Sequence, residues 1–173
     1  MPYTDLLRLS VFLAAGEATV LGAIAAIGSG REESSTLALA VAAGWWLVAM
    51  AVGLYLGRPE RAADGVRDPL ARARTATSLP QEDPTRIALR RLWPIGAIGL
   101  IGGVLGIFFV GVATVGAGYA LLVALAWRSH EAAVLSVEQR DGTKFYVVPN
   151  SALQPVELVR APGLRTDRLR ATP

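Results

Sequence analysis

The 173-residue chain contains no cysteine, one histidine (His130) and one lysine (Lys144). Without cysteine it forms no disulfide and offers no thiolate as a nucleophile or as a metal ligand. A single histidine also excludes the histidine-rich ligand sets that hold zinc and other transition metals. We therefore predict no metal site and no cofactor.

The common catalytic and nucleotide-binding motifs are missing as well. The sequence contains no P-loop, no Rossmann glycine pattern, no nucleophile elbow and no zinc-ligand spacing. Its basic segments lack the interleaved aromatic residues of a nucleic-acid-binding surface. We predict no catalytic residue, and we expect a protein that is not an enzyme and does not bind nucleic acid.

Charged residues are scarce, and the apolar residues lie in long blocks. Only 18% of the residues are charged, 53% are hydrophobic, and the mean hydropathy is +0.43. The blocks cover residues 6–28, 36–57 and 92–128. The first two have the ~20 residues that cross the ~30 Å hydrocarbon core of a bilayer. This pattern predicts an all-α membrane protein that contacts the lipid bilayer.

The third block is too long for one span. Two helices at 92–109 and 113–128, with a tight turn near Gly111 to Thr114, fit at the short end of the usual span length. A re-entrant hairpin is the alternative, because glycine is frequent in this block. We predict four transmembrane helices in a domain of residues 1–128, followed by a tail of residues 129–173.

Basic residues predict the orientation, because Lys and Arg are retained on the cytoplasmic side of a membrane. If both termini and the loop 58–91 are cytoplasmic, 16 of the 17 basic residues lie on that side and only Arg31 lies opposite. All of them except Lys144 are arginine, which together with frequent Ala and Gly indicates a bacterial source. We predict a bacterial inner (plasma) membrane protein whose N-terminus and C-terminus are both cytoplasmic.

The loop 58–91 is rich in proline and too polar to form a core of its own. Its last part has helix-start residues, Asp83 as a cap and Pro84 at the first position. Arg86, Arg90 and Arg91 follow and are candidates for contact with lipid headgroups. The simpler explanation is that these three arginines only form part of the orientation signal.

The tail sequence predicts a small β-hairpin. Two strand-like runs, VLSVEQ and KFYVV, flank an Asp-Gly pair that favours a two-residue turn, and residues 155–160 are a candidate third strand. The hairpin would place Phe145 on one face and an apolar set on the other. This set consists of Leu135, Val137, Tyr146 and Val148. Because a lone hairpin is marginal in water, we predict that the apolar set contacts a partner protein, the long loop or the membrane.

Small residues recur at every fourth position within the spans, as in Ala49, Gly53 and Gly57, and in Gly99 and Gly103. Membrane helices pack closely through such residues, since lipid provides no hydrophobic force between helices. We expect these faces to hold the four helices together. The alternative is that a Gly-rich face, above all the one in the third span, binds a second copy or another protein.

One charged residue, Glu17, lies in the middle of the first span. A charge there costs ~3 kcal/mol or more, so this side chain either faces the bundle interior or is protonated. Trp45, Trp46 and Tyr119 lie at a comparable depth and are candidate hydrogen-bond donors. A structural hydrogen bond is the favoured interpretation. Proton- or cation-coupled transport and contact with a partner subunit or a quinone-like lipid are the alternatives.

A glutamate in the first of four helices resembles the small multidrug resistance transporters, in which such a carboxylate exchanges protons for cationic drugs. The resemblance covers Glu17 and its neighbours only, and those transporters have short loops and little beyond their helices. It therefore implies no function for the whole chain. The sequence favours a non-catalytic accessory or assembly subunit of a membrane complex. A small proton- or cation-coupled transporter that uses Glu17 is the alternative.

Overall fold

The computed structural model describes residues 1–30, 35–75, 83–152 and 154–162. Within these ranges the chain forms four long helices, which are α1 (Tyr3–Ser29), α2 (Ser35–Leu56), α4 (Pro84–Phe108) and α5 (Val110–Trp127). Among the described residues, four helical segments are long and apolar enough to cross a membrane. The prediction of a mostly helical protein with four such helices is confirmed.

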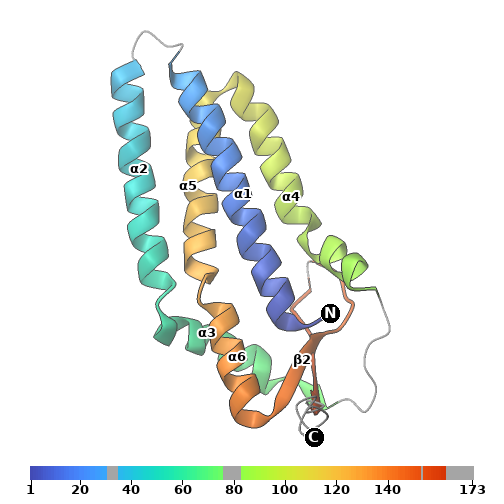
Figure 1. The fold of residues 1–173 in the computed structure, drawn as a ribbon. Helices are drawn as coiled ribbons and strands as arrows, with labels where there is room; N and C mark the ends of the chain where they lie inside the picture. Colours follow the sequence, from blue (N-terminus) through green and yellow to red (C-terminus); the bar gives the residue numbers. More distant parts are fainter. Residues whose placement is uncertain (31–34, 76–82, 153, 163–173) are drawn as a thin grey trace, which may run out of the picture.

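The four long helices form a bundle with α1 and α5 side by side at its centre (Figure 1). α2 packs on α5 and α4 packs on α1. A Cβ atom at Gly53 of α2, or at Gly57 just after this helix, would overlap Leu125 of α5, so these glycines set how closely the two helices approach. Gly99 and Gly103 of α4 face α1. The small-residue faces therefore pack the helices of one chain on one another, as expected.

The predicted turn near Gly111 to Thr114 is wrong in position, because α4 ends at Phe108 and α5 begins at Val110. Only Phe109 separates the two helices, with an extended backbone (φ −129°, ψ 92°). Such a short connection requires close contact, and a Cβ at Gly106 would overlap Ala113. α4 has 25 residues and α5 has 18, which correspond to helix lengths of about 37 and 27 Å. They therefore form two long antiparallel helices and not a short re-entrant pair.

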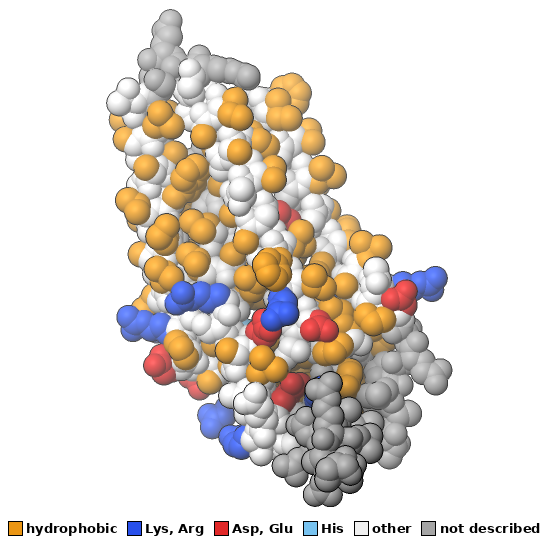
Figure 2. Space-filling model, viewed as in Figure 1, with side chains coloured by type: hydrophobic (Ala, Val, Ile, Leu, Met, Phe, Trp, Pro, Cys, Tyr) orange, Lys and Arg blue, Asp and Glu red, His pale blue; other side chains and the backbone are white. Residues whose placement is uncertain are grey.

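The other elements gather at one end of the bundle and form a unit that we term the polar domain. They are α3 (Pro59–Ala71), α6 (His130–Asp141), β1 (Arg74–Thr75), β2 (Thr143–Val147) and β3 (Leu158–Pro162). Figure 2 shows basic and acidic side chains concentrated at this end, whereas hydrophobic side chains cover the bundle. The N-terminus lies at the same end (Figure 1).

The predicted β-hairpin is wrong, because its first strand is part of the helix α6. The Asp-Gly pair ends this helix and makes no turn between strands. Gly142 adopts a left-handed conformation (φ 62°), and its N–H donates to the carbonyl of Glu138. This is a common helix C-terminus, and it needs the same positive φ as a hairpin turn, so the local sequence alone does not distinguish the two. Burial of Val134, which is 0% exposed, favours the helix.

The apolar set proposed for the hairpin is accordingly divided between two elements. Leu135 and Val137 lie on α6, whereas Tyr146 pairs with Val159 in the sheet and Val148 follows β2. The hairpin prediction placed Phe145 on the face opposite the apolar set. In the structure Phe145 instead lies in the core of the polar domain. The four residues do not form one continuous face.

The sheet has the strand order β1–β3–β2. β2 runs antiparallel to β3, from the pair Thr143 and Pro162 to the pair Val147 and Leu158. β1 adds two residues parallel to β3. The candidate third strand at 155–160 is therefore correct in part, since β3 begins at Leu158. The antiparallel partner of β2 is thus β3, which follows it after a long connection, and not residues 134–139 across a tight turn.

Part of the loop 58–91, which is too polar for a core of its own, is folded as α3 against other elements. Ala62, Val66 and Leu70 occupy one face of this helix and are buried against the rest of the polar domain. A polar segment can fold when another element covers its apolar face. The expected start of α4 is confirmed, since Asp83 accepts a hydrogen bond from the N–H of Thr85 at 3.0 Å. The core comprises Met1, Tyr3, Leu6, Leu7, Val66, Leu70, Ile87, Val134, Phe145, Val147 and Leu158.

Candidate functional site

Glu17 lies on the side of α1 that faces α4, and its carboxyl group is placed directly against Gly99. A Cβ atom at position 99 would overlap this carboxyl group. Any side chain at position 99 would therefore compete with Glu17 for the same space. The glycine allows a carboxyl group to lie within the contact between the two helices.

An apolar groove of about 800 Å³ lies between α1, α4 and α5, and Glu17 is part of its wall. The other walls are almost entirely apolar, with two aromatic side chains, Tyr119 and Trp127, contributed by α5. A smaller groove of about 370 Å³ lies against α1 and α4, and Glu17 and Gly99 line this groove too. The carboxyl group thus borders two grooves, and the walls of both lie in the hydrophobic part of the bundle.

The predicted hydrogen bonds from Trp45, Trp46 and Tyr119 to Glu17 are not formed. The indole N–H of Trp46 donates to the carbonyl of Thr114 at 3.0 Å, and that of Trp45 donates to Val115 at 3.4 Å. Both bonds join α2 to α5, because the close approach at Gly53 and Gly57 directs α2 to α5 and away from Glu17.

Tyr119 belongs to the groove, but it packs its ring against Trp45 at a centroid distance of 5.4 Å and an angle of 64°. This edge-to-face arrangement is favourable between aromatic rings. Trp45 does not line the groove, but its contact with Tyr119 helps to fix the position of this groove residue. The sequence therefore assigned the two indoles the wrong hydrogen-bond partner, whereas Tyr119 lines the same groove as Glu17.

Glu17 has no partner within the part of the chain that the structure describes. Its Oε1 atom is buried and forms no hydrogen bond with a described residue. Between residues 9 and 28, 36 and 57, and 92 and 127, the sequence contains no Lys, Arg or His that could neutralise a carboxylate. A buried polar atom without a partner is costly, which marks Glu17 as the candidate functional residue of the bundle.

The three headgroup candidates at the start of α4 differ from one another. Arg91 donates hydrogen bonds of 2.8 Å to the carbonyls of Ser151 and Gln154. It therefore holds the β2–β3 connection to α4 and is not directed to lipid. Arg86 and Arg90 are exposed.

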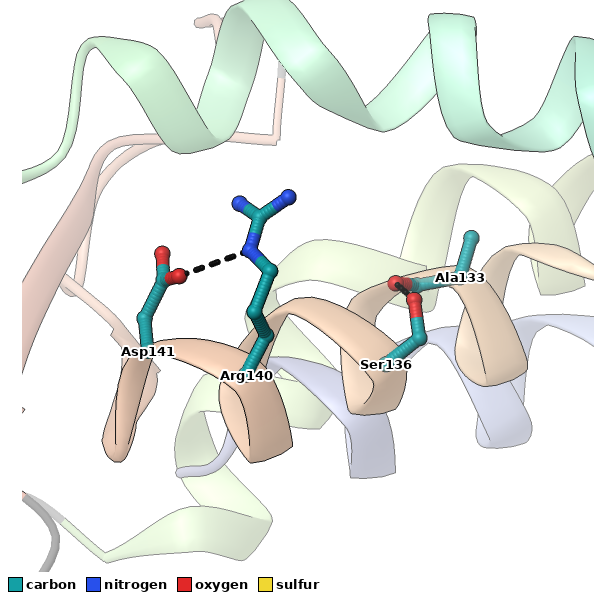
Figure 3. Close-up of polar contacts among 4 residues, drawn as sticks. All are labelled: Ala133, Ser136, Arg140 and Asp141. Atoms are coloured by element: carbon teal, nitrogen blue, oxygen red, sulfur yellow. Dashed lines mark hydrogen bonds and ion pairs between the residues drawn. The ribbon is translucent and has the colours of Figure 1, made fainter.

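A further groove, which is charged and has a volume of about 460 Å³, lies between α3 and α6, with Arg67, Arg140 and Arg160 on its walls. Figure 3 shows part of α6 there: Arg140 Nε donates to Asp141 Oδ1 at 2.9 Å, and the Ser136 hydroxyl donates to the carbonyl of Ala133 at 2.7 Å. Both hydrogen bonds join residues within α6. Among the described residues no group of three His, Cys, Asp or Glu side chains could hold a metal ion.

Replacing Gly99 by alanine should destabilise the bundle by about 1 kcal/mol, the low end of the cost of overpacking, because the new methyl group displaces the Glu17 carboxyl but this end of a flexible side chain can shift. Thermal unfolding in detergent measures this effect. Gly96→Ala is the matched control, since no atom beyond its chain neighbours and the local helix backbone lies within 4 Å of a Cβ at Gly96. Equal stability of the two variants would contradict the contact between Glu17 and Gly99.

The chain matches no protein-family model, no curated protein and no solved structure. The case for a function therefore depends on the geometry around Glu17.

Proposed function

We propose that this multi-pass membrane protein binds an apolar, positively charged molecule in the groove between α1, α4 and α5, in exchange for a proton on Glu17. The observation that carries the proposal is the buried Oε1 atom of Glu17, which has no described partner and belongs to a side chain that forms part of the groove wall. The proposed function is that of a small proton-coupled transporter.

The exchange follows from charge compensation. An ionised carboxylate inside the bilayer is costly unless a cation lies beside it, and no basic side chain lies in the apolar parts of the four helices. Glu17 is therefore neutral when it carries a proton, or ionised when a bound cation balances it. The proton and the cation exclude each other at one site, which is the minimal requirement for coupled exchange.

The size and chemistry of the groove favour a small organic cation over a metal ion. Its volume of about 800 Å³ lies within the range of 300–1,000 Å³ that is usual for small-molecule sites. The apolar walls offer contact area to the body of such a molecule. Tyr119 and Trp127 offer aromatic faces, which attract organic cations.

Calorimetric titration with tetraphenylphosphonium, a permanently charged apolar cation, tests this function. We expect saturable binding that releases one proton per cation, which is detected by comparing buffers of different ionisation enthalpy. In the acidic range where Glu17 is protonated, the apparent Kd should rise up to tenfold for each unit of decrease in pH, because proton and cation compete. Binding without proton release would overturn the exchange.

An accessory or assembly subunit of a membrane complex is the second candidate function. The polar domain favours it, because this domain is folded around a core that includes Phe145 and Val147, both 0% exposed, together with the first residues of α1 and Ile87 of α4. A helical transporter bundle has no need of such a domain, whereas a subunit that contacts another protein does. Purification in mild detergent with identification of the co-purified proteins tests this candidate. A stoichiometric partner would favour it, and a chain that purifies alone would contradict it.

We further propose that the polar domain lies on the cytoplasmic side of a bacterial plasma membrane, as the distribution of basic residues indicates. The absence of cysteine allows a direct test with single cysteines at Gly30, Ala71 and Ser151. In intact cells an impermeant thiol reagent should label Gly30→Cys only, because Ala71 and Ser151 belong to the polar end. Labelling of Ala71→Cys or Ser151→Cys without cell lysis would reverse the orientation.

A further inference from the structure

The start of α4 carries an exposed surface that combines basic and apolar side chains. Arg86, Leu89, Arg90 and Trp93 are spaced at i, i+3, i+4 and i+7, so they share one side of the helix. We term these four residues the α4 face. Leu89 is 71% exposed and Trp93 is 57% exposed. Two large apolar side chains beside two arginines are typical of a surface that meets the boundary of a membrane.

The length of α4 places this surface at the bilayer boundary. α4 ends at Phe108, and a helix crosses ~30 Å of hydrocarbon with about 20 residues. Counting back from Phe108 places Leu89 at the edge of the hydrocarbon and Arg86 outside it. Leu89 and Trp93 therefore contact the upper part of the acyl chains, whereas the two guanidinium groups lie at the level of the headgroups.

The opposite side of the same helical turns is fixed to the polar domain. Ile87 is 2% exposed and lies in the core of that domain. Arg91 donates two hydrogen bonds of 2.8 Å to the carbonyls of the β2–β3 connection. These contacts fix the rotation of the helix, so Arg86 and Arg90 point away from the polar domain. Neither forms an ion pair or a side-chain hydrogen bond with a residue that the structure describes.

We propose that the α4 face is a binding site for an anionic phospholipid. Guanidinium groups bind phosphate through paired hydrogen bonds, and Arg86 and Arg90 lie one helical turn apart, so that both can reach one headgroup. The indole N–H of Trp93 is available for the ester groups below the phosphate, and Leu89 packs on the acyl chain. A zwitterionic lipid also carries a phosphate, but its own ammonium group offsets the charge. The site therefore selects a headgroup with net negative charge.

Fluorescence quenching by brominated lipids tests this site. The intact protein is reconstituted in vesicles that contain either dibrominated phosphatidylglycerol or dibrominated phosphatidylcholine at equal mole fraction, and the signal of Trp93 is obtained by subtracting that of Trp93→Phe. Each basic residue near the surface favours anionic lipid roughly five-fold. We expect Trp93 to prefer phosphatidylglycerol about 5- to 25-fold, and inorganic phosphate in solution to leave this preference unchanged.

Two double variants provide the comparison. Arg86→Gln with Arg90→Gln should reduce the preference to about one, whereas Arg67→Gln with Arg72→Gln, which removes the same charge from exposed positions of α3 and its C-cap, should keep it. High salt applied to the unchanged protein should weaken the preference without any substitution. Equal quenching of Trp93 by both lipids would overturn the proposal. Loss of the preference in the α3 control would do the same, because net charge alone would then explain it.

Discussion

Glu17→Gln should weaken binding of an apolar cation by about 30-fold or more while the bundle stays folded. Glutamine has the size of a protonated glutamate but cannot carry the negative charge that balances a cation. Removing one partner of a buried charge pair costs about 2–5 kcal/mol, which corresponds to at least this factor in Kd. Titration with tetraphenylphosphonium measures it, and the release of protons on binding should disappear together with the affinity.

The fold should tolerate Glu17→Gln, because the Glu17 carboxyl forms no hydrogen bond with a described residue. Glu131→Gln is a suitable control. It makes the same chemical change in the polar domain, where Glu131 pairs with Arg8 at 3.1 Å, and it should leave cation binding unchanged. If Glu17→Gln unfolds the bundle, the carboxyl has a structural role that an amide of the same size cannot replace. If it binds the cation as tightly as the wild type, Glu17 is not the recognition group.

Phe145→Ala should destabilise the polar domain by about 3–5 kcal/mol, the usual cost of truncating a buried phenylalanine. The Phe145 side chain is 0% exposed, its ring lies under the guanidinium of Arg160 at 5.4 Å, and its backbone N–H donates to Glu138 at 2.9 Å. Loss of the ring leaves a cavity where β2 meets the helices. Hydrogen exchange of the β2 and β3 amides, together with limited proteolysis between these strands, would show the opening of the domain.

Leu135→Ala is the matched control for Phe145→Ala. Leu135 is 38% exposed on α6, so its truncation should cost less than about 1 kcal/mol. In the hairpin that the sequence suggested, the order would be reversed, because Leu135 would lie on the covered face and Phe145 opposite it. A larger effect for Leu135 than for Phe145 would therefore contradict the packing of the polar domain.

The four spanning helices could be predicted from the sequence because lipid imposes a simple requirement. A backbone without water must satisfy its own hydrogen bonds, so a long uncharged block becomes a helix whatever its neighbours are. Only the boundary between α4 and α5 was displaced, since Gly106, Gly111 and their neighbours permit a turn at several positions. The helix start at Asp83 and Pro84 was predictable for a similar reason, because capping is a local interaction.

The polar domain and the surroundings of Glu17 depended on contacts between distant segments. The sequence 134–147 is compatible with a hairpin and with a helix followed by a strand. The second arrangement forms because α3 packs on α6 and covers Val134, while β3 pairs with β2 at Phe145.

The surroundings of Glu17 are a second example. The sequence alone shows that Glu17 lies in the membrane without a basic partner. Only the packing of α2 on α5 assigns the indoles of Trp45 and Trp46 to carbonyls of α5, and only the packing of α4 on α1 leaves the carboxyl beside Gly99 and an apolar groove. Burial in the membrane is a property of composition, whereas the partners of a buried group are set by which helices approach closely, and small residues far apart in the chain determine that.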